Sequence, residues 1–183
     1  MNAVYLDYNA STPCDPLVIE SMAPYWLSFG NPHSNHIFGI KKQTTIAECL
    51  DTLSEIYNCL PEDVIFTSGA TEANNLAIFS GIKLALKENS EANVIVTSYL
   101  EHKSVLEPLK VIAKKLDLTI IYIDINKNGI LDLVDLKQKL FENQVLWASF
   151  CMTNGEIGTN QPIAEMSNLC QQYDVRLHVD ASQ

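Results

Sequence analysis

The sequence predicts an α/β protein of three layers (αβα), with helices on both faces of a mostly parallel sheet. Short runs rich in β-branched residues alternate with longer segments whose apolar residues follow helical spacing, the pattern of repeated βαβ units. Several of the short runs are continuously apolar, as expected for strands buried on both faces. The 183 residues are 47% hydrophobic, which is enough for one substantial core.

The first thirty or so residues differ from the rest, because Pro13, Pro16 and Pro24 interrupt regular structure. We expect an extended arm, a short helix over 17–27 and a loop at Gly30-Asn31-Pro32. The following strands are expected in chain order at 64–67, 93–98, 118–123, 145–150 and 175–179. The helices that separate them are expected at 39–59, 71–87, 104–115, 133–140 and 163–173, with a turn at Asn126-Lys127-Asn128-Gly129.

Charge and cysteine content exclude several classes of protein. The net charge is −10 and Arg176 is the only arginine, whereas nucleic acids and anionic membranes are bound by clustered cations. We therefore expect no direct nucleic-acid partner. No run approaches the ~18 apolar residues of a membrane helix, and the N-terminus lacks a signal-peptide pattern. The five cysteines lack CxxC spacing, which favours the reducing cytoplasm. We expect each to be a small buried hydrophobic residue: Cys14, Cys49, Cys59, Cys151 and Cys170.

The first candidate site follows the strand expected at 64–67 and opens the next helix. It reads Thr67-Ser68-Gly69-Ala70-Thr71-Glu72-Ala73-Asn74-Asn75. Small residues let the backbone approach a ligand, and a helix N-terminus offers N–H groups at the positive end of its dipole. These features fit a phosphate. An ordinary helix start with Thr71 as the cap fits the spacing equally well.

The second candidate is His102, in Glu101-His102-Lys103-Ser104 after the strand at 93–98. An imidazole at this edge of the sheet could stack on an aromatic ligand or transfer a proton. A histidine satisfied by structural hydrogen bonds is the alternative. We interpret Lys103 as a solvated residue at a helix start, not as a Schiff-base lysine.

Two further candidates follow the last two strands. The loop Thr153-Asn154-Gly155-Glu156-Ile157-Gly158-Thr159 combines glycines with polar groups, which fits either close approach to a ligand or a plain connecting loop. Asp180 ends an apolar strand, and a buried carboxylate needs a cation or several donors. A protonated heterocyclic nitrogen would serve, and the alternative is a helix N-cap.

The four candidates all follow strands, so one parallel sheet brings them to one edge. A phosphate cradle, a stacking imidazole, polar loop groups and a buried carboxylate describe a pocket for a phosphorylated, protonatable aromatic ring. Pyridoxal 5′-phosphate (PLP) fits this description, because its pyridine nitrogen is paired with an Asp in PLP enzymes.

The motifs, taken together, resemble the N-terminal half of a cysteine desulfurase of the NifS/IscS type, in the class-V aminotransferase family. They occur in the order and spacing of that family over nearly the whole chain. The matching segments are Tyr5-Leu6-Asp7-Tyr8-Asn9-Ala10-Ser11-Thr12-Pro13, Gly30-Asn31-Pro32-His33-Ser34, Thr67-Ser68-Gly69-Ala70-Thr71-Glu72, Glu101-His102-Lys103, Glu156-Ile157-Gly158-Thr159-Asn160-Gln161-Pro162-Ile163 and His178-Val179-Asp180-Ala181-Ser182-Gln183.

This resemblance implies the PLP-dependent transferase fold of type I and sulfur removal from L-cysteine, giving L-alanine and an enzyme persulfide. It implies that Ala70 and Thr71 hold the phosphate and that His102 stacks on the ring and assists proton transfer. Asp180 would pair with the pyridinium nitrogen, and Gln183 would hydrogen-bond the phenolic oxygen. It also implies a cytoplasmic homodimer that passes sulfur to an acceptor or scaffold protein for iron–sulfur cluster assembly or tRNA thiolation.

Two departures from the family pattern stand out. The family has Asn-Asn-Glu before the Ile-Gly pair and its second Asn contacts the cofactor, whereas this chain has Asn154-Gly155-Glu156. The family's Schiff-base lysine, nucleophilic cysteine and substrate-binding arginine would lie beyond Gln183. We therefore expect a truncated large domain, inactive alone: an arm and short helix over 1–30, a partial PLP-binding domain over 31–183, and no C-terminal small domain in this sequence.

Two alternatives remain open from the sequence. A selenocysteine lyase-like enzyme of the same class would share the motifs that precede Gln183. A non-catalytic fragment or partner-binding remnant of the fold is also compatible with Gly155 and with the missing lysine. No metal site is expected.

Overall fold

A computed structural model describes residues 3–183, which divide into two compact units. The first unit ends at Phe66, and the second comprises Thr67–Gln183. The division into 1–30 and 31–183 expected from the sequence stays a prediction. None of the helices in the described range is both long and apolar enough to cross a membrane.

The first unit contains the helices α1 (Pro16–Trp26) and α2 (Ile37–Tyr57) and the short 3-10 helix η1 (Pro61–Asp63). Both predicted helices are therefore confirmed. Asp15 caps α1 by accepting a hydrogen bond from the backbone N–H of Leu17 at 2.8 Å. In α2, a Cβ at Gly39 would lie 2.2 Å from the carbonyl oxygen of Ser34. Only glycine therefore fits where the preceding loop crosses this helix.

Two sequence predictions for the first unit and its boundary are wrong. Residues 64–67 form no strand, and Ile65 and Phe66 are 66% and 58% exposed. A strand is held by hydrogen bonds to a neighbouring strand, and none of the strands in residues 3–183 pairs with this segment.

The predicted burial of cysteines holds for Cys151 and Cys170 but fails for Cys14 and Cys49, which are exposed. The reason is that few side chains of the first unit are buried at all.

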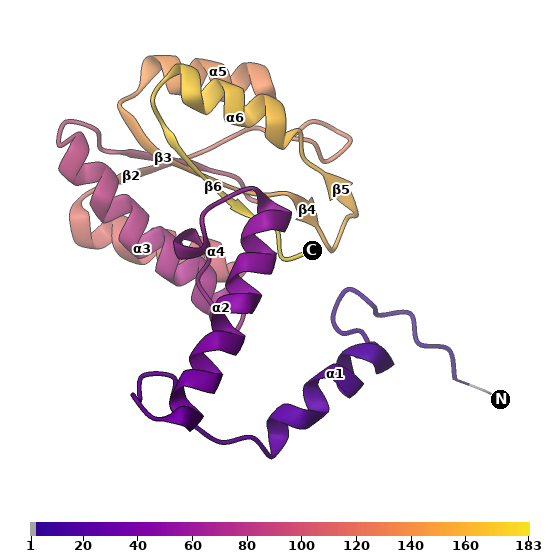
Figure 1. The fold of residues 1–183 in the computed structure, drawn as a ribbon. Helices are drawn as coiled ribbons and strands as arrows, with labels where there is room; N and C mark the ends of the chain where they lie inside the picture. Colours follow the sequence, from indigo (N-terminus) through magenta and orange to yellow (C-terminus); the bar gives the residue numbers. More distant parts are fainter. Residues whose placement is uncertain (1–2) are drawn as a thin grey trace. The chain divides into compact units, whose positions relative to one another are not determined.

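The second unit is built on a parallel sheet of four strands. These are β1 (Val94–Thr97), β2 (Thr119–Tyr122), β3 (Val145–Cys151) and β6 (Arg176–Asp180), in the order β2-β1-β3-β6. All three strand pairs are parallel, and Figure 1 shows β2, β3 and β6 of this sheet between two layers of helices. The carboxyl ends of the strands therefore meet at one edge of the sheet.

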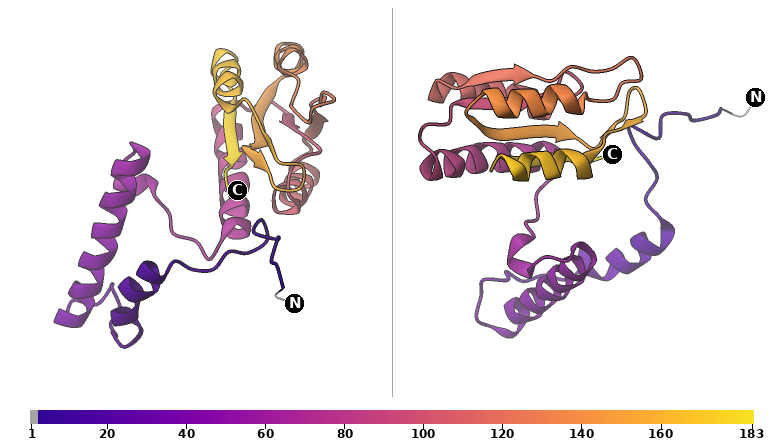
Figure 2. Two further views of the ribbon diagram at one scale, coloured as in Figure 1. Left: turned by 90° about the vertical axis from the view of Figure 1, so that its right-hand side faces the viewer. Right: turned by 90° about the horizontal axis from the view of Figure 1, so that it is seen from above.

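Helices cover both faces of this sheet, as the sequence predicted (Figures 1 and 2). On one face lie α3 (Ala70–Glu88) and α4 (Lys103–Leu116). Their apolar side chains form one core with Ile95 and Trp147. On the other face lie α5 (Leu133–Glu142) and α6 (Ile163–Gln172), whose side chains form a second core with Val96 and Phe150. Neighbouring residues of a strand point to opposite faces of the sheet, so the strands contribute side chains to both cores.

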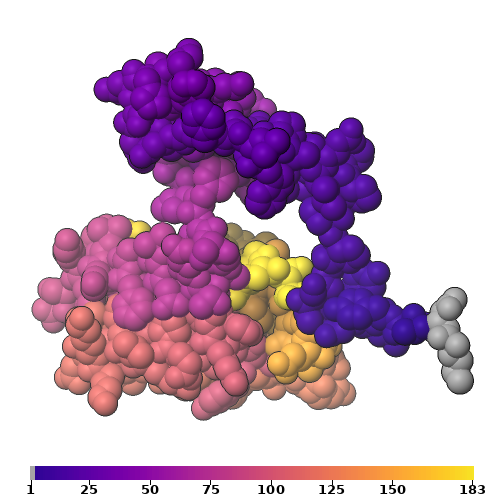
Figure 3. All heavy atoms as spheres, turned by 90° about the horizontal axis from the view of Figure 1, so that it is seen from below, coloured from indigo at the N-terminus to yellow at the C-terminus, as the bar shows by residue number. Residues whose placement is uncertain are grey.

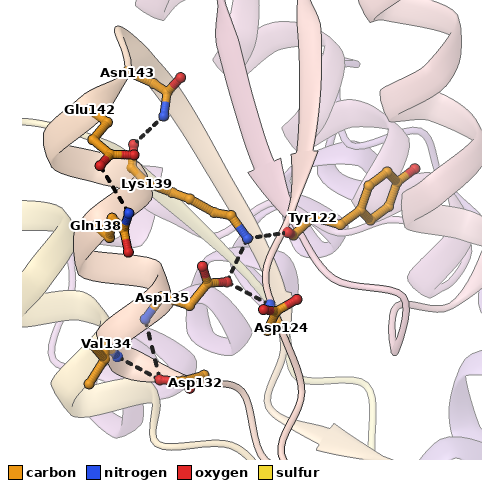
Figure 4. Close-up of polar contacts among 9 residues, drawn as sticks. All are labelled: Tyr122, Asp124, Asp132, Val134, Asp135, Gln138, Lys139, Glu142 and Asn143. Atoms are coloured by element: carbon orange, nitrogen blue, oxygen red, sulfur yellow. Dashed lines mark hydrogen bonds and ion pairs between the residues drawn. The ribbon is translucent and has the colours of Figure 1, made fainter.

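A lysine and an aspartate fix α5 to the end of β2 (Figure 4). Nζ of Lys139 donates to the carbonyl oxygen of Tyr122 at 2.7 Å and to the carboxylate of Asp135 at 2.5 Å. The same carboxylate accepts a hydrogen bond from the backbone N–H of Asp124 at 2.7 Å. These bonds satisfy the backbone where the strand ends, so they set the helix against the sheet.

The predicted loop at 153–159 contains a small hairpin that the sequence did not indicate. Its strands are β4 (Thr153–Asn154) and β5 (Thr159–Asn160), which pair antiparallel. Gly158 has φ +70, a left-handed conformation that glycine adopts without strain. The predicted turn at 126–129 is confirmed, because Asn126 accepts a hydrogen bond from the N–H of Gly129 at 2.9 Å.

Candidate functional site

The N-terminus of α3 is open to a ligand. The helix begins at Ala70 with Gly69 as the N-cap, so Thr71 lies inside the helix and the alternative that it is the cap is wrong. Gly69 has no side chain to accept from the first turn, whose amides have no carbonyl partner within the helix. A Cβ at Gly69 would have no heavy atom within 4 Å. The backbone N–H groups of Ala70, Thr71 and Glu72 are therefore suited to an anion.

Asp180 lies at the carboxyl end of β6 and is 9% exposed. Its Oδ1 accepts hydrogen bonds from the backbone N–H of Ser182 at 3.1 Å and from the Ser182 hydroxyl. Its Oδ2 accepts one from Nδ2 of Asn74 at 2.9 Å. Burial alone would raise the pKa of this carboxyl group, but the hydrogen bonds from Ser182 and Asn74 outweigh it and lower the pKa below its usual value. Asp180 is therefore a buried carboxylate at neutral pH.

Asn74 connects this carboxylate to His102. Its Nδ2 also donates to Oγ of Ser104 at 3.0 Å, and Oγ of Ser104 lies 2.8 Å from Nδ1 of His102. His102 is the N-cap of α4 and accepts a hydrogen bond from the N–H of Ser104 at 3.1 Å. The structure therefore joins the first, second and fourth candidates of the sequence through one set of hydrogen bonds.

Asn74 and Ser104 were not predicted to connect the site, although both lie in segments that the sequence singled out. The signal that could have found Asn74 is its spacing, because it lies one turn after Thr71 on the same face of α3. Lys103 is exposed at the start of α4, as predicted.

The third candidate contacts the C-terminal residues of the chain. A Cβ at Gly155 would lie 3.3 Å from Cδ of Gln183, so Gly155 and Gln183 lie against each other. Nδ2 of Asn154 donates to the carbonyl oxygen of Leu100 at 2.9 Å. Its Oδ1 accepts from the N–H groups of Glu156 and Ile157 at 2.9 and 3.0 Å, so the side chain of Asn154 shapes the hairpin.

Residues 181–183 are exposed, and the C-terminal part of the chain reaches the surface in Figure 3 (yellow). A second carboxyl group near Asp180 is buried: Glu101 is 6% exposed and accepts a hydrogen bond from Oγ of Ser98 at 2.6 Å. Burial raises the pKa of Glu101 to about 7, with a further rise from the nearby charge of Asp180. This second buried carboxyl group was not predicted from the sequence.

The donors and acceptors at this edge suit PLP in kind. Backbone N–H groups at a helix N-terminus bind phosphate, and a buried ionised carboxylate is the partner of a pyridinium nitrogen. Among the described residues no cluster of His, Cys, Asp or Glu could hold a metal ion.

Comparison with known proteins agrees with this geometry. Residues 4–183 match the model of the family described as aminotransferase class-V, whose members are PLP-dependent. A cysteine desulfurase IscS from Ehrlichia chaffeensis is 39% identical over 181 residues, which is 98% of this chain and 43% of that protein. The chain therefore spans less than half the length of this relative.

Solved structures give the same picture of the fold. A NifS-like protein is 29% identical with a TM-score of 0.87, covering 97% of this chain and 48% of the other. A structure described as SspA in complex with cysteine is 32% identical with a TM-score of 0.85, covering 98% of this chain and 50% of the other. The chain belongs to the class-V aminotransferase family and has the α/β fold of its PLP-dependent cysteine desulfurases.

Proposed function

We propose that the protein to which these residues belong is a PLP-dependent cysteine desulfurase, which converts L-cysteine to L-alanine and leaves the sulfur on the enzyme as a persulfide. The observation that carries the proposal is Asp180, a buried carboxylate held by Asn74 and Ser182 at the carboxyl edge of the sheet. Its partner in this chemistry is a pyridinium nitrogen. The desulfurase relative and the cysteine complex of SspA support the choice of substrate.

Each predicted site residue has a proposed role. The N–H groups of Ala70 and Thr71 bind the phosphate, and the Thr71 hydroxyl adds a donor. Asp180 keeps the ring nitrogen protonated. His102 lies against the ring and assists proton transfer, and Gln183 donates to the phenolic oxygen. The cofactor, once bound, withdraws electrons from the substrate carbon.

The hairpin residues border the cofactor in this proposal. Asn154 is bonded to Leu100 and to its own turn, so we assign it the role of holding the loop. Gly155 leaves room for the side chain of Gln183, since an added Cβ would lie 3.3 Å from its Cδ. The hydrogen bond that a side chain at position 155 would make to the cofactor is absent, a difference of about 0.5–1.5 kcal/mol for a neutral bond.

The remaining expectations are part of the same proposal. The protein acts as a cytoplasmic homodimer and passes sulfur to an acceptor or scaffold protein, for iron–sulfur cluster assembly or tRNA thiolation. The odd number of cysteines without CxxC spacing supports the reducing compartment. The arm and short helix over 1–30 precede a PLP-binding domain that begins at residue 31 and continues through Gln183.

The test compares the protein at its full natural length with the variants Asp180→Asn and Asp117→Asn. Asp180→Asn keeps the shape and removes the charge. Loss of one partner of a buried charge pair costs about 2–5 kcal/mol, so kcat/KM should fall about 30-fold or more, measured as alanine formation and as sulfide released by an added thiol that reduces the persulfide. Asp117 is an exposed left-handed helix cap with φ +55, a conformation that asparagine tolerates. Asp117→Asn should therefore leave the rate unchanged.

Three results would contradict the proposal. One is a wild-type protein that gives no absorbance band at about 400–430 nm with PLP. Another is a band without release of alanine and sulfide, which would indicate a non-catalytic member of the fold. The third is a much higher kcat/KM for selenocysteine than for cysteine, which would indicate a selenocysteine lyase.

A further inference from the structure

Three hydrogen bonds form a continuous path from Asp180 through Asn74 and Ser104 to His102. The distances are 2.9 Å from Nδ2 of Asn74 to Asp180, 3.0 Å from Nδ2 to Oγ of Ser104, and 2.8 Å from that Oγ to Nδ1 of His102. Asn74, Ser104 and Asp180 are 5%, 9% and 9% exposed. Buried polar groups of this kind require partners with matching donors and acceptors, so the direction of each bond can be worked out.

The donor and the acceptor can be identified first in the hydrogen bond between Ser104 and the ring of His102. The backbone N–H of Ser104 points at Nδ1 of the ring at 3.1 Å, and a backbone amide nitrogen can only donate. Nδ1 is therefore an acceptor and carries no proton. In a neutral imidazole the proton then lies on Nε2.

The other bonds follow from this first one. Because Nδ1 accepts, the hydroxyl of Ser104 directs its proton at the ring, and its lone pairs are free to accept from Nδ2 of Asn74. An amide NH2 group has two hydrogens. One is directed at Ser104 and the other at Asp180, which is ionised and only accepts. A reversed amide would set Oδ1 of Asn74 against the carboxylate, so the orientation of Asn74 is fixed as well.

We infer that Asn74 and Ser104 are positioning residues that hold His102 in the tautomer protonated on Nε2 and hold Asp180 as an acceptor. The inference rests on the proposed function only in taking His102 and Asp180 to face the cofactor. The proton that His102 can donate to a ligand is then on Nε2, because Nδ1 already accepts from the backbone N–H and the hydroxyl of Ser104 in α4. One amide thus sets both the imidazole and the carboxylate, although residues 74 and 180 are 106 positions apart.

The test measures the tautomer of His102 in the full-length protein without added cofactor. Long-range ¹⁵N–¹H spectra of ¹⁵N-histidine protein distinguish a protonated ring nitrogen from an unprotonated one. The histidine resonance that disappears from the spectrum of His102→Gln is assigned to His102. We expect a single neutral tautomer, with Nε2 protonated and Nδ1 bare. A wild-type spectrum with the proton on Nδ1, or with both tautomers populated, overturns the inference.

Variants test the two positioning residues. Nδ1 of His102 accepts from both the backbone N–H and the hydroxyl of Ser104, and Asn74 orients that hydroxyl. Ser104→Ala and Asn74→Ala leave the backbone N–H as the only one of these two donors still held toward Nδ1, so each should make the second tautomer measurable. Ser104→Thr, which keeps the hydroxyl, should retain the single species. Asn143→Ala is the matched control, because Nδ2 of Asn143 also donates to a backbone carbonyl, that of Lys139 at 2.8 Å, and Asn143 ends α5 away from the candidate site. An unchanged tautomer in both Ser104→Ala and Asn74→Ala overturns the inference.

A second readout concerns Asp180. A hydrogen bond to a charged group contributes about 1.5–3 kcal/mol, so Asn74→Ala should weaken PLP binding about tenfold or more, whereas Asn143→Ala should not. Equal affinities of Asn74→Ala and wild type contradict the role assigned at Asp180. The spectra need neither PLP nor cysteine. A single Nε2–H species without desulfurase activity would therefore contradict the proposed function alone, and an active enzyme with a mixed tautomer would contradict this inference alone.

Discussion

Glu101 makes the stability of the protein depend on pH in a way that one substitution should remove. Its carboxyl group is 6% exposed and lies close to the charge of Asp180. Burial raises its pKa from 4.5 to about 7 in the folded protein. The folded state therefore keeps the proton over a range in which the unfolded chain has lost it. By linkage, stability is fully present below about pH 4.5 and falls as the pH rises to about 7.

The magnitude follows from the two pKa values. A gap of about 2.5 between them corresponds to about 3 kcal/mol, since one pKa unit is about 1.4 kcal/mol. Glu101→Gln has the shape of the neutral acid, retains an acceptor for the Ser98 hydroxyl and cannot ionise. Relative to wild type, the variant should gain up to about 3 kcal/mol in free energy of unfolding between pH 4.5 and pH 8.

The assay is urea unfolding of wild type and Glu101→Gln at several pH values and at one protein concentration, because association changes apparent stability. Glu107→Gln is the control, since Glu107 is 62% exposed and pairs with Lys110 at the surface. Its effect should stay within about 0.5 kcal/mol at every pH. If the difference between wild type and Glu101→Gln is the same at pH 4.5 and pH 8, the reasoning about Glu101 is refuted.

Two further predictions concern packing and ion pairing. Gly81→Ala should destabilise the protein by about 1–3 kcal/mol in urea unfolding, because the new Cβ would lie 2.4 Å from the indole of the buried Trp147. This clash should outweigh the better helix propensity of alanine. Equal or higher stability of the variant would contradict the prediction. Arg176→Ala should cost at most about 1 kcal/mol, and less at high salt, because the bidentate pair with Glu88 is half exposed; a double-mutant cycle with Glu88→Ala that gives a larger, salt-independent coupling would contradict it.

The spacing of apolar residues was sufficient to predict a helix or strand whose structure is determined by its own residues. The apolar runs of β1 and β3 and the amphipathic spacing of α4 were visible in the sequence, and the structure confirms them. The strand expected at 64–67 failed although its composition is suitable, because a strand exists only with a hydrogen-bonded neighbour. The hairpin β4–β5 was missed for the opposite reason, since its strands are only two residues long.

The candidate site likewise contains residues that the sequence singled out and residues whose role only the structure revealed. Roles for His102 and Asp180 could be proposed from the sequence, because residue type and position after a strand indicate a role. The small residues before α3 follow no strand in the structure, and their proposed role depends on their place at a helix N-terminus. Asn74 and Ser104 could not be assigned, since each looks like an ordinary helical or capping residue. Their importance comes from partners 106 and 30 positions away along the chain.

The sequence by itself determined the α/β class, the alternation of elements and the residue types that can serve a phosphorylated ring, because these follow from periodicity and side-chain chemistry. Only the tertiary structure decided the strand order β2-β1-β3-β6, the burial of Glu101 and the orientation of the amide of Asn74. Those features depend on which distant segments pack together, since burial sets pKa values and a hydrogen bond needs its partner within about 3 Å.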